Sequence, residues 1–187
     1  MARAQLREKI IEKMAPKEGT IAEIGVFKGA FSEKLLKLTN PKKLFLVDPW
    51  QNLDDTGVKN SWYHAESSND MPAIYEGVCG RFEEQIEAGQ VEVLRGTSKE
   101  LAAAIPDGAL DFAYIDGDHR FHGVLEDLNF LSPKIRIKGM IMLDDHVLGR
   151  WWDDGVVRAL NTFLGENAAS WQIARAVGNQ VVVRRHR

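Results

Sequence analysis

The sequence predicts an α/β fold in which an open twisted sheet of five parallel strands is closed by an antiparallel hairpin strand and covered by helices on both faces. First, short strand-like apolar runs alternate with apolar residues at helical spacing along most of the chain. Second, a two-residue hairpin signal, Gly178-Asn179, follows this alternation near the C-terminus. Third, polar residues directly follow the strand-like runs, at the edge where open α/β sheets bind ligands. Together these observations predict a Rossmann-like fold.

The first helix is expected within residues 1–15 of a single domain that covers residues 1–187. Four apolar side chains share one face of this helix, and Pro16 and Gly19 end it. These side chains are Leu6, Ile10, Ile11 and Met14. A chain of 187 residues can bury one good hydrophobic core but is short for two, and the sequence has no internal repeat.

Five apolar runs of strand length predict the parallel strands, which occupy residues 20–24, 44–47, 91–94, 112–115 and 140–143. The hairpin is expected to join strands at 171–177 and 180–184. Residues 49–69 form the longest irregular stretch, and loops of this length in compact domains are usually functional or mobile.

Between the strands, apolar residues at helical spacing predict helices that cover the sheet. Asn40-Pro41 ends the second of these helices. One continuous helix is expected over residues 70–87, where apolar residues are spaced by four, and Ser98 is expected to cap a short helix. Two further helices are marked by Val124, Leu125, Leu128 and Leu131, and then by Val156, Val157, Leu160 and Phe163.

Charge and composition argue against several classes of protein. The formal net charge of -3 and the pI near 6.0 disfavour general binding to nucleic acid, which depends on Lys and Arg neutralising phosphates. Cys79 is the only cysteine, so the chain can form no internal disulfide or multi-cysteine zinc site, and a reducing compartment fits. No apolar run is long enough to span a bilayer. We expect a cytoplasmic protein that binds neither nucleic acid nor a membrane.

The turn after the first strand, Glu23-Ile24-Gly25-Val26-Phe27-Lys28-Gly29, is the most informative segment. A dinucleotide-binding turn needs glycine where Glu23 stands, because the diphosphate approaches the backbone closely there. A carboxylate would repel a diphosphate and attract a cation, and S-adenosylmethionine (SAM) carries an ammonium and a sulfonium without any phosphate. Gly25 and Gly29 would let the chain turn tightly beneath this ligand. The segment could also be an ordinary strand-to-helix turn with an exposed Glu23.

Asp48 supports the first interpretation, because it ends the second strand, where an acid accepts hydrogen bonds from a ribose diol. It could instead be a solvated strand end. Together, Glu23, Gly25, Gly29 and Asp48 resemble the early motifs of class I SAM-dependent methyltransferases. The alternation of strands and helices resembles the fold of that class over nearly the whole chain. The resemblance implies an enzyme that uses SAM. The predicted cofactor contacts are Glu23, Gly25, Gly29, Asp48, Thr97, Ser98 and Asp116.

The later strand ends narrow this resemblance. The segments 48–50, 111–119, 123–124, 127–128 and 143–146, together with Gly139, resemble the small-molecule methyltransferases grouped as methyltransferase family 24. In related metal-dependent O-methyltransferases, a carboxylate after the fourth strand and an acidic or amide pair after the fifth hold Mg²⁺. The resemblance implies that Asp116, Asp144 and Asp145 bind Mg²⁺ and that the substrate is a small molecule with a hydroxyl group.

The same three carboxylates suit a hard cation on chemical grounds, since oxygen ligands are those that Mg²⁺ prefers. A bound Mg²⁺ would orient a substrate hydroxyl and lower its pKa. His119, close after Asp116, is the candidate base, because imidazole titrates near neutral pH, and His146 is the second candidate. Asp116-Gly117 could instead be only a turn, Asp145 could cap a helix, and either histidine could be a surface residue.

The sequence does not identify the methyl acceptor. Aromatic residues in the long loop and after the fifth strand could wall a pocket or could pack in the core. They are Trp50, Trp62, Tyr63, His64, Trp151 and Trp152. A lid over the strand ends would come from the long loop, the N-terminal helix or a second subunit, so a homo-oligomer is one option.

Three alternatives remain. A metal-independent SAM methyltransferase would use His119 or His146 as its base. A non-catalytic SAM-binding module would keep Glu23 and Asp48 but would have no need for the acids across the strand ends. An NAD-dependent oxidoreductase would share the sheet, but it requires a glycine where Glu23 stands.

Overall fold

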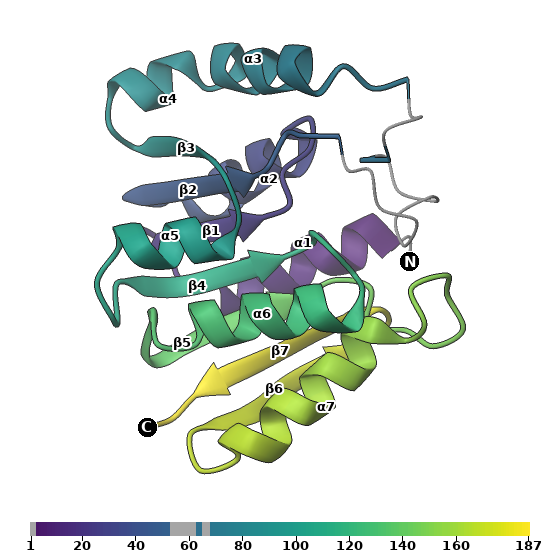
Figure 1. The fold of residues 1–187 in the computed structure, drawn as a ribbon. Coiled ribbons are helices and arrows are strands. Elements are labelled where there is room, and N and C mark those ends of the chain that lie inside the picture. The colour runs from purple at the N-terminus through teal and green to yellow at the C-terminus, as the bar shows by residue number, and fades with distance from the viewer. Residues whose placement is uncertain (1–2, 53–62, 65–67) are drawn as a thin grey trace.

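The computed structural model describes residues 3–52, 63–64 and 68–187, and seven strands in this part of the chain form one sheet in the order β3-β2-β1-β4-β5-β7-β6 (Figure 1). The strands are β1 Thr20–Ile24, β2 Lys43–Asp48, β3 Val91–Arg95, β4 Leu110–Ile115, β5 Ile135–Leu143, β6 Trp171–Val177 and β7 Gln180–Arg185. Strands β1 to β5 pair in parallel, whereas β7 is antiparallel to both β5 and β6. The predicted fold class is confirmed, and the predicted hairpin closes the sheet with the two antiparallel strands β6 and β7.

Helices cover both faces of the sheet. They are α1 Arg3–Met14, α2 Ala30–Thr39, α3 Met71–Arg81, α4 Glu83–Glu87, α5 Ser98–Ala104, α6 Phe121–Leu131 and α7 Gly155–Asn167. Figure 1 shows α5, α6 and α7 on one face and α1 and α2 on the other. Among the described residues, no helix combines the length and the apolar character that crossing a membrane requires.

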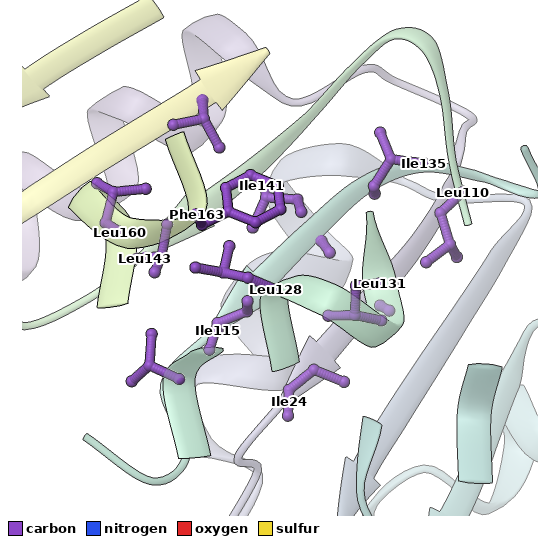
Figure 2. Packing of buried hydrophobic residues seen from close by; sticks show 14 of the residues in the cluster. Ile24, Leu110, Ile115, Leu128, Leu131, Ile135, Ile141, Leu143, Leu160 and Phe163 are labelled. Carbon is purple, nitrogen blue, oxygen red and sulfur yellow. The ribbon is translucent and has the colours of Figure 1, made fainter. Parts of the chain in front are cut away.

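Two hydrophobic cores, one on each face, hold these layers together. In the first, Ile24, Ile115 and Leu143 from three neighbouring strands pack in one cluster with Leu128 of α6 and Leu160 of α7 (Figure 2). The second contains side chains from α1, α2, α3 and the opposite side of the strands, among them Ile11, Leu35, Val78, Leu46 and Tyr114. Side chains of a strand alternate between faces, so each central strand contributes to both cores.

Two local features differ from the sequence prediction. The helix expected over 70–87 is divided at Phe82, whose φ of −111° and ψ of 18° leave the helical region. Phe82 is nevertheless buried, so the spacing of apolar residues predicts the buried face but not the break. The cap of α5 is Thr97, not Ser98, because Thr97 and Glu100 form a reciprocal capping box.

The topology brings one set of polar residues together. Because β1, β4 and β5 are parallel neighbours, their carboxyl ends meet at one edge of the sheet. Glu23 lies near the end of β1, Asp116 follows β4, and Asp144 follows β5.

Candidate active site

Two adjoining cavities lie along this edge. The larger has a volume of about 690 Å³ and the smaller a volume of about 410 Å³. Both are lined by the same five residues: Gly25, Tyr63, Gly117, His119 and Trp151. The two cavities therefore form neighbouring parts of one groove over the ends of β1 and β4.

Gly25 is one of the residues that line both cavities. Its φ of +90° is a conformation that favours glycine, and a Cβ atom there would lie 2.4 Å from the backbone oxygen of Asp116. The turn after β1 can therefore approach the loop after β4 only without a side chain at this position. Gly29, the other predicted glycine, begins α2 with a φ of +74° and packs toward Phe82. It is not among the described residues that line either cavity.

Glu23 is an ionisable group held away from water beside the larger cavity. Its side chain is buried, and within the described residues its Oε2 atom has no hydrogen-bond partner. Burial raises the pKa of Glu23 to about 8, because a charged carboxylate is poorly solvated there. A cation bound in the cavity would stabilise the ionised form, which agrees with the predicted role of Glu23 as a site for an ammonium group.

Asp48 binds the turn that Gly25 begins. Its Oδ2 atom accepts hydrogen bonds from the backbone N–H groups of Val26 and Phe27, both at 2.9 Å, and from the Tyr63 hydroxyl. Its Oδ1 atom accepts the N–H of Trp50 at 2.8 Å. Asp48 also lines the smaller cavity, and among the described residues its Oδ1 atom accepts fewer hydrogen bonds than its Oδ2 atom.

Thr97 and Ser98 also line the smaller cavity. The Thr97 side chain is engaged in capping α5, and the Ser98 hydroxyl donates a 2.6 Å hydrogen bond to Asp127. Asp127 lies on α6 and lines the same cavity, and burial raises its pKa to about 7. The sequence analysis gives Asp127 no role in the site, although an acid beside Leu128 on the apolar face of a helix is a signal that the sequence contains.

Asp144 lies against protein donors on both of its oxygens. It is buried, and Oδ1 accepts hydrogen bonds from the side-chain amide of Gln180 and from the backbone N–H of Asp145. Oδ2 accepts from the Tyr114 hydroxyl at 2.7 Å and from the Arg7 guanidinium at 2.9 Å. Four hydrogen-bond donors from the described residues thus surround a carboxylate that the family resemblance predicts to bind Mg²⁺.

The structure brings the other two predicted metal ligands together with His119. The Nε2 atom of His119 lies 3.3 Å from Oδ1 of Asp116 and 3.4 Å from Oδ2 of Asp145. One ligand atom from each of these three residues lies within 4.8 Å of the others. Asp145 adopts a left-handed backbone conformation, with a φ of 53°, which few residues other than glycine adopt and which often marks a functional site.

Electrostatics couple this group of three. Burial lowers the pKa of His119, but the nearby carboxylates of Asp116, Asp145 and Asp144 raise it, and the net pKa lies above its usual value. Burial also raises the pKa of Asp116, an effect that Asp144 increases and His119 opposes. A proton or a cation between these groups therefore relieves the repulsion of the carboxylates. His146 does not line either cavity among the described residues, and burial lowers its pKa.

Arg7 reaches the same acids from the N-terminal helix and was missed by sequence reasoning. Its Nη1 atom lies 2.9 Å from Asp144 and 3.3 Å from Asp116, and its guanidinium carbon lies 3.8 Å from the centre of the Phe31 ring. Arg7 lies three positions before Ile10, on the apolar side of its helix, and this placement was the available signal.

Of the aromatic residues that the sequence proposes for a pocket, some line the cavities and others lie in the hydrophobic core. Trp152 lines the larger cavity with its ring 5.0 Å from that of His119, and its buried Nε1 atom has no partner among the described residues. Trp151 lines both cavities and is 44% exposed. Trp50 is instead buried in the core, where its Nε1 donates to the backbone oxygen of Phe27. Trp62 lies outside the described residues.

The sequence matches one family of known proteins. Residues 22–146 match methyltransferase family 24, which is described as a methyltransferase domain. No curated protein matches the chain in sequence.

Solved structures with a similar fold include the O-methyltransferase NovP, at 20% identity over 98% of this chain and 77% of that chain, with a TM-score of 0.65. A proposed rRNA methylase from Clostridium thermocellum is similar at 11% identity, over 98% of this chain and 96% of that chain, with a TM-score of 0.66. A proposed methyltransferase from Streptococcus mutans in complex with S-adenosylhomocysteine (SAH) is similar at 10% identity, over 99% of this chain and 98% of that chain, with a TM-score of 0.64. At these identities the likeness concerns the fold alone, whereas the family match spans most of the chain. The chain therefore belongs to methyltransferase family 24 and is a SAM-dependent methyltransferase.

Proposed function

We propose that this protein transfers the methyl group of SAM to a hydroxyl oxygen of a small molecule bound in the larger cavity, with the help of a divalent cation such as Mg²⁺. The observation that carries the proposal is the group formed by Asp116, His119 and Asp145 beside the cavity that Glu23 also lines. A carboxylate suited to an ammonium group, two carboxylates suited to a cation and a neighbouring imidazole thus line the same space.

The residues of the groove fit SAM. Glu23 would bind the ammonium of its methionine end, and Gly25, which lines both cavities, allows the turn to lie against the loop after β4. Asp48 would accept a hydrogen bond from the ribose, and Thr97 and Ser98 line the smaller cavity, which suits the adenosine end. When bound, SAM supplies an activated methyl group on a sulfonium, which needs an aligned nucleophile but no further activation.

The two carboxylates beside His119 also fit a divalent cation. Asp116 and Asp145 offer carboxylate oxygens within 4.8 Å of each other and of His119 Nε2. Asp144 already accepts four hydrogen bonds, so we propose that it orients this pair, through the backbone N–H of Asp145, more than it binds the ion. When bound, Mg²⁺ supplies a Lewis acid that lowers the pKa of a substrate hydroxyl.

His119 would accept the proton of the substrate hydroxyl. The substrate oxygen would then form a bond to the methyl carbon while the carbon–sulfur bond breaks, which yields the methyl ether and SAH. The proton stays on His119 Nε2 until it passes to water. The same atom could serve as a third metal ligand, and the two roles are separable, because loss of a ligand weakens metal binding whereas loss of a base does not.

The direct test is calorimetric titration with SAH, with and without Mg²⁺, followed by methyl transfer from labelled SAM to a panel of hydroxylated small molecules. We expect SAH to bind without metal, and transfer to the panel to require it. Because one structural neighbour is a proposed rRNA methylase, ribosomal RNA belongs in the same assay. The net charge of -3 favours the small molecule, and labelling of RNA alone would reject the proposed substrate class.

A further inference from the structure

Two side chains that line the larger cavity each carry a buried polar atom without a hydrogen-bond partner among the described residues. These atoms are Oε2 of Glu23 and Nε of Arg7. Unpartnered buried polar atoms are uncommon in folded proteins, and a position that receives a ligand is one reason for them. The sequence prediction accounts for Glu23 by an ammonium group, and it leaves Arg7 without a role.

The guanidinium of Arg7 is held by contacts that leave its Nε–H group unused. Its Nη1 atom is directed to Tyr114 at 2.8 Å and to Asp144 at 2.9 Å, and its plane lies over Phe31. The Nε–H group makes none of these contacts. A guanidinium fixed in this way loses little conformational freedom when a carboxylate binds.

Arg7 and Glu23 both line the larger cavity. The charge of Arg7 lowers the pKa of Glu23, in opposition to the effect of burial. The two side chains therefore bring a cation and an acid to the wall of one cavity. This pattern is complementary to an α-amino acid, which carries a carboxylate and an ammonium on a single carbon.

We infer that Arg7 binds the carboxylate of the methionine end of SAM through its Nε–H group, opposite the ammonium that Glu23 binds. The N-terminal helix would thus supply a cofactor contact in addition to covering the cavity. The inference rests on the orientation that the proposed function gives to SAM in the groove.

A structural role for Arg7 is the main alternative, because its guanidinium also compensates the charges of Asp116 and Asp144. Two lysines line the same cavity and could bind the carboxylate instead. Lys28 is exposed, and Lys34 forms an ion pair with Glu8 on α1. The test has to separate these possibilities from loss of the cofactor's amino-acid site as a whole.

The experiment compares the affinity of SAH with that of its decarboxylated analogue, measured by calorimetry. For the unaltered protein we expect SAH to bind about tenfold or more tightly than the analogue, the scale of one charge-assisted hydrogen bond. Arg7→Met should abolish this preference while affinity for the analogue stays within a few-fold. Lys34→Met should retain it. Equal weakening of both ligands by Arg7→Met would overturn the inference, and so would loss of the preference in Lys34→Met.

A measurement on the unaltered protein covers the case in which Arg7→Met does not fold. The ¹⁵N-labelled Arg7 Nε–H resonance, assigned by its disappearance in Arg7→Lys, should shift on addition of SAH and stay in place with the decarboxylated analogue. Equal responses to both ligands would reject the contact. Failure of either ligand to bind at all would instead contradict the placement of SAM in this groove, so the two failures are distinguishable.

Discussion

A Cβ atom on Gly25 would lie 2.4 Å from the backbone oxygen of Asp116, so the turn after β1 and the loop after β4 pack closely against each other at this residue. The first of these loops carries the expected cofactor site and the second carries the expected metal and base. Their separation is thus set by a position where any side chain is too large.

Gly25→Ala should therefore destabilise the protein and impair SAM binding. The left-handed φ of +90° and the contact with Asp116 both oppose a side chain, and we expect a loss of about 2–4 kcal/mol in the free energy of unfolding. Gly77→Ala is the matched control. Gly77 lies in α3, and a Cβ atom there would have no neighbour within 4 Å, so alanine should stabilise by about 0.5–1 kcal/mol. Urea denaturation of both variants decides the matter, and equal stabilities would contradict it.

Thr97 has two candidate roles that substitution can separate. As the cap of α5 it should cost about 1 kcal/mol when changed to alanine, and Thr97→Ser should restore most of that loss. If Thr97 also contacts the cofactor, SAH affinity should fall in Thr97→Ala by more than the fraction of unfolded protein explains. Thermal melts and calorimetry on the same samples measure the two effects, and unchanged affinity would leave Thr97 as a cap alone.

If Glu23 binds the ammonium of SAM as proposed, SAM binding should depend on pH. Burial raises its pKa to about 8, so at pH 7 the free protein carries a protonated Glu23, whereas the ammonium of SAM requires the carboxylate. Binding at pH 6.5–7 should release about one proton, and affinity should rise toward pH 8 by up to about tenfold per pH unit. Above that pH the cofactor amine, with a reference pKa of about 8, loses its own proton and affinity should fall.

Calorimetry in buffers with different ionisation enthalpies measures this proton release directly. Glu23→Gln should remove the proton release, while Glu33→Gln, on the outside of α2, should not.

The raised pKa of Glu23 should also make the stability of the free protein depend on pH. A group that is protonated in the fold stabilises it fully below the unfolded pKa of about 4.5, and that contribution is lost as pH rises toward 8. Bound SAM should reverse this loss.

Much of this architecture could be predicted because it depends on local patterns. Apolar runs of strand length and helical spacing mark the elements, and the parallel order follows from their alternation. The acids were found for the same reason: a residue that directly follows a strand lies at the binding edge wherever the strands are placed. Glu23, Asp48 and Asp116 each line one of the two cavities.

The unpredicted part depends on contacts between distant segments. Nothing near Arg7 in the sequence shows that its partners follow β4 and β5, more than a hundred residues away. The different surroundings of Asp144 and Asp145 are equally hidden. They follow from the left-handed backbone of Asp145 and from Gln180, which the closing hairpin brings to Asp144. Adjacent identical residues therefore have different environments.

Trp152 offers a test of the acceptor side of the cavity. Its buried Nε1–H has no partner among the described residues and lies on a ring beside His119, where a substrate oxygen could accept a hydrogen bond. Trp152→Phe keeps an aromatic ring and removes the donor. We expect KM for the acceptor to rise about fivefold to twentyfold, the scale of one neutral hydrogen bond, with SAH affinity unchanged. An unaltered KM would show that the indole N–H does not contact the acceptor.

The metal site is tested by the contrast between two neighbouring aspartates. Asp145→Asn should weaken Mg²⁺ binding and turnover while leaving the fold nearly as stable, because its carboxylate faces His119. Asp144→Asn should instead lower stability by about 1–3 kcal/mol, because an amide nitrogen would meet donors where the carboxylate accepted hydrogen bonds. EDTA should act like Asp145→Asn and leave SAH binding intact.

The role of His119 as the base is tested separately. His119→Ala should keep Mg²⁺ affinity and lower kcat by a factor of about 10²–10⁴, and this loss should shrink as pH rises and the substrate ionises without a base. Full turnover in EDTA would remove the cation from the mechanism and leave His119 to act alone. Loss of Mg²⁺ affinity in His119→Ala would make it a ligand, and the proton would then have to leave through Asp116 or Asp145.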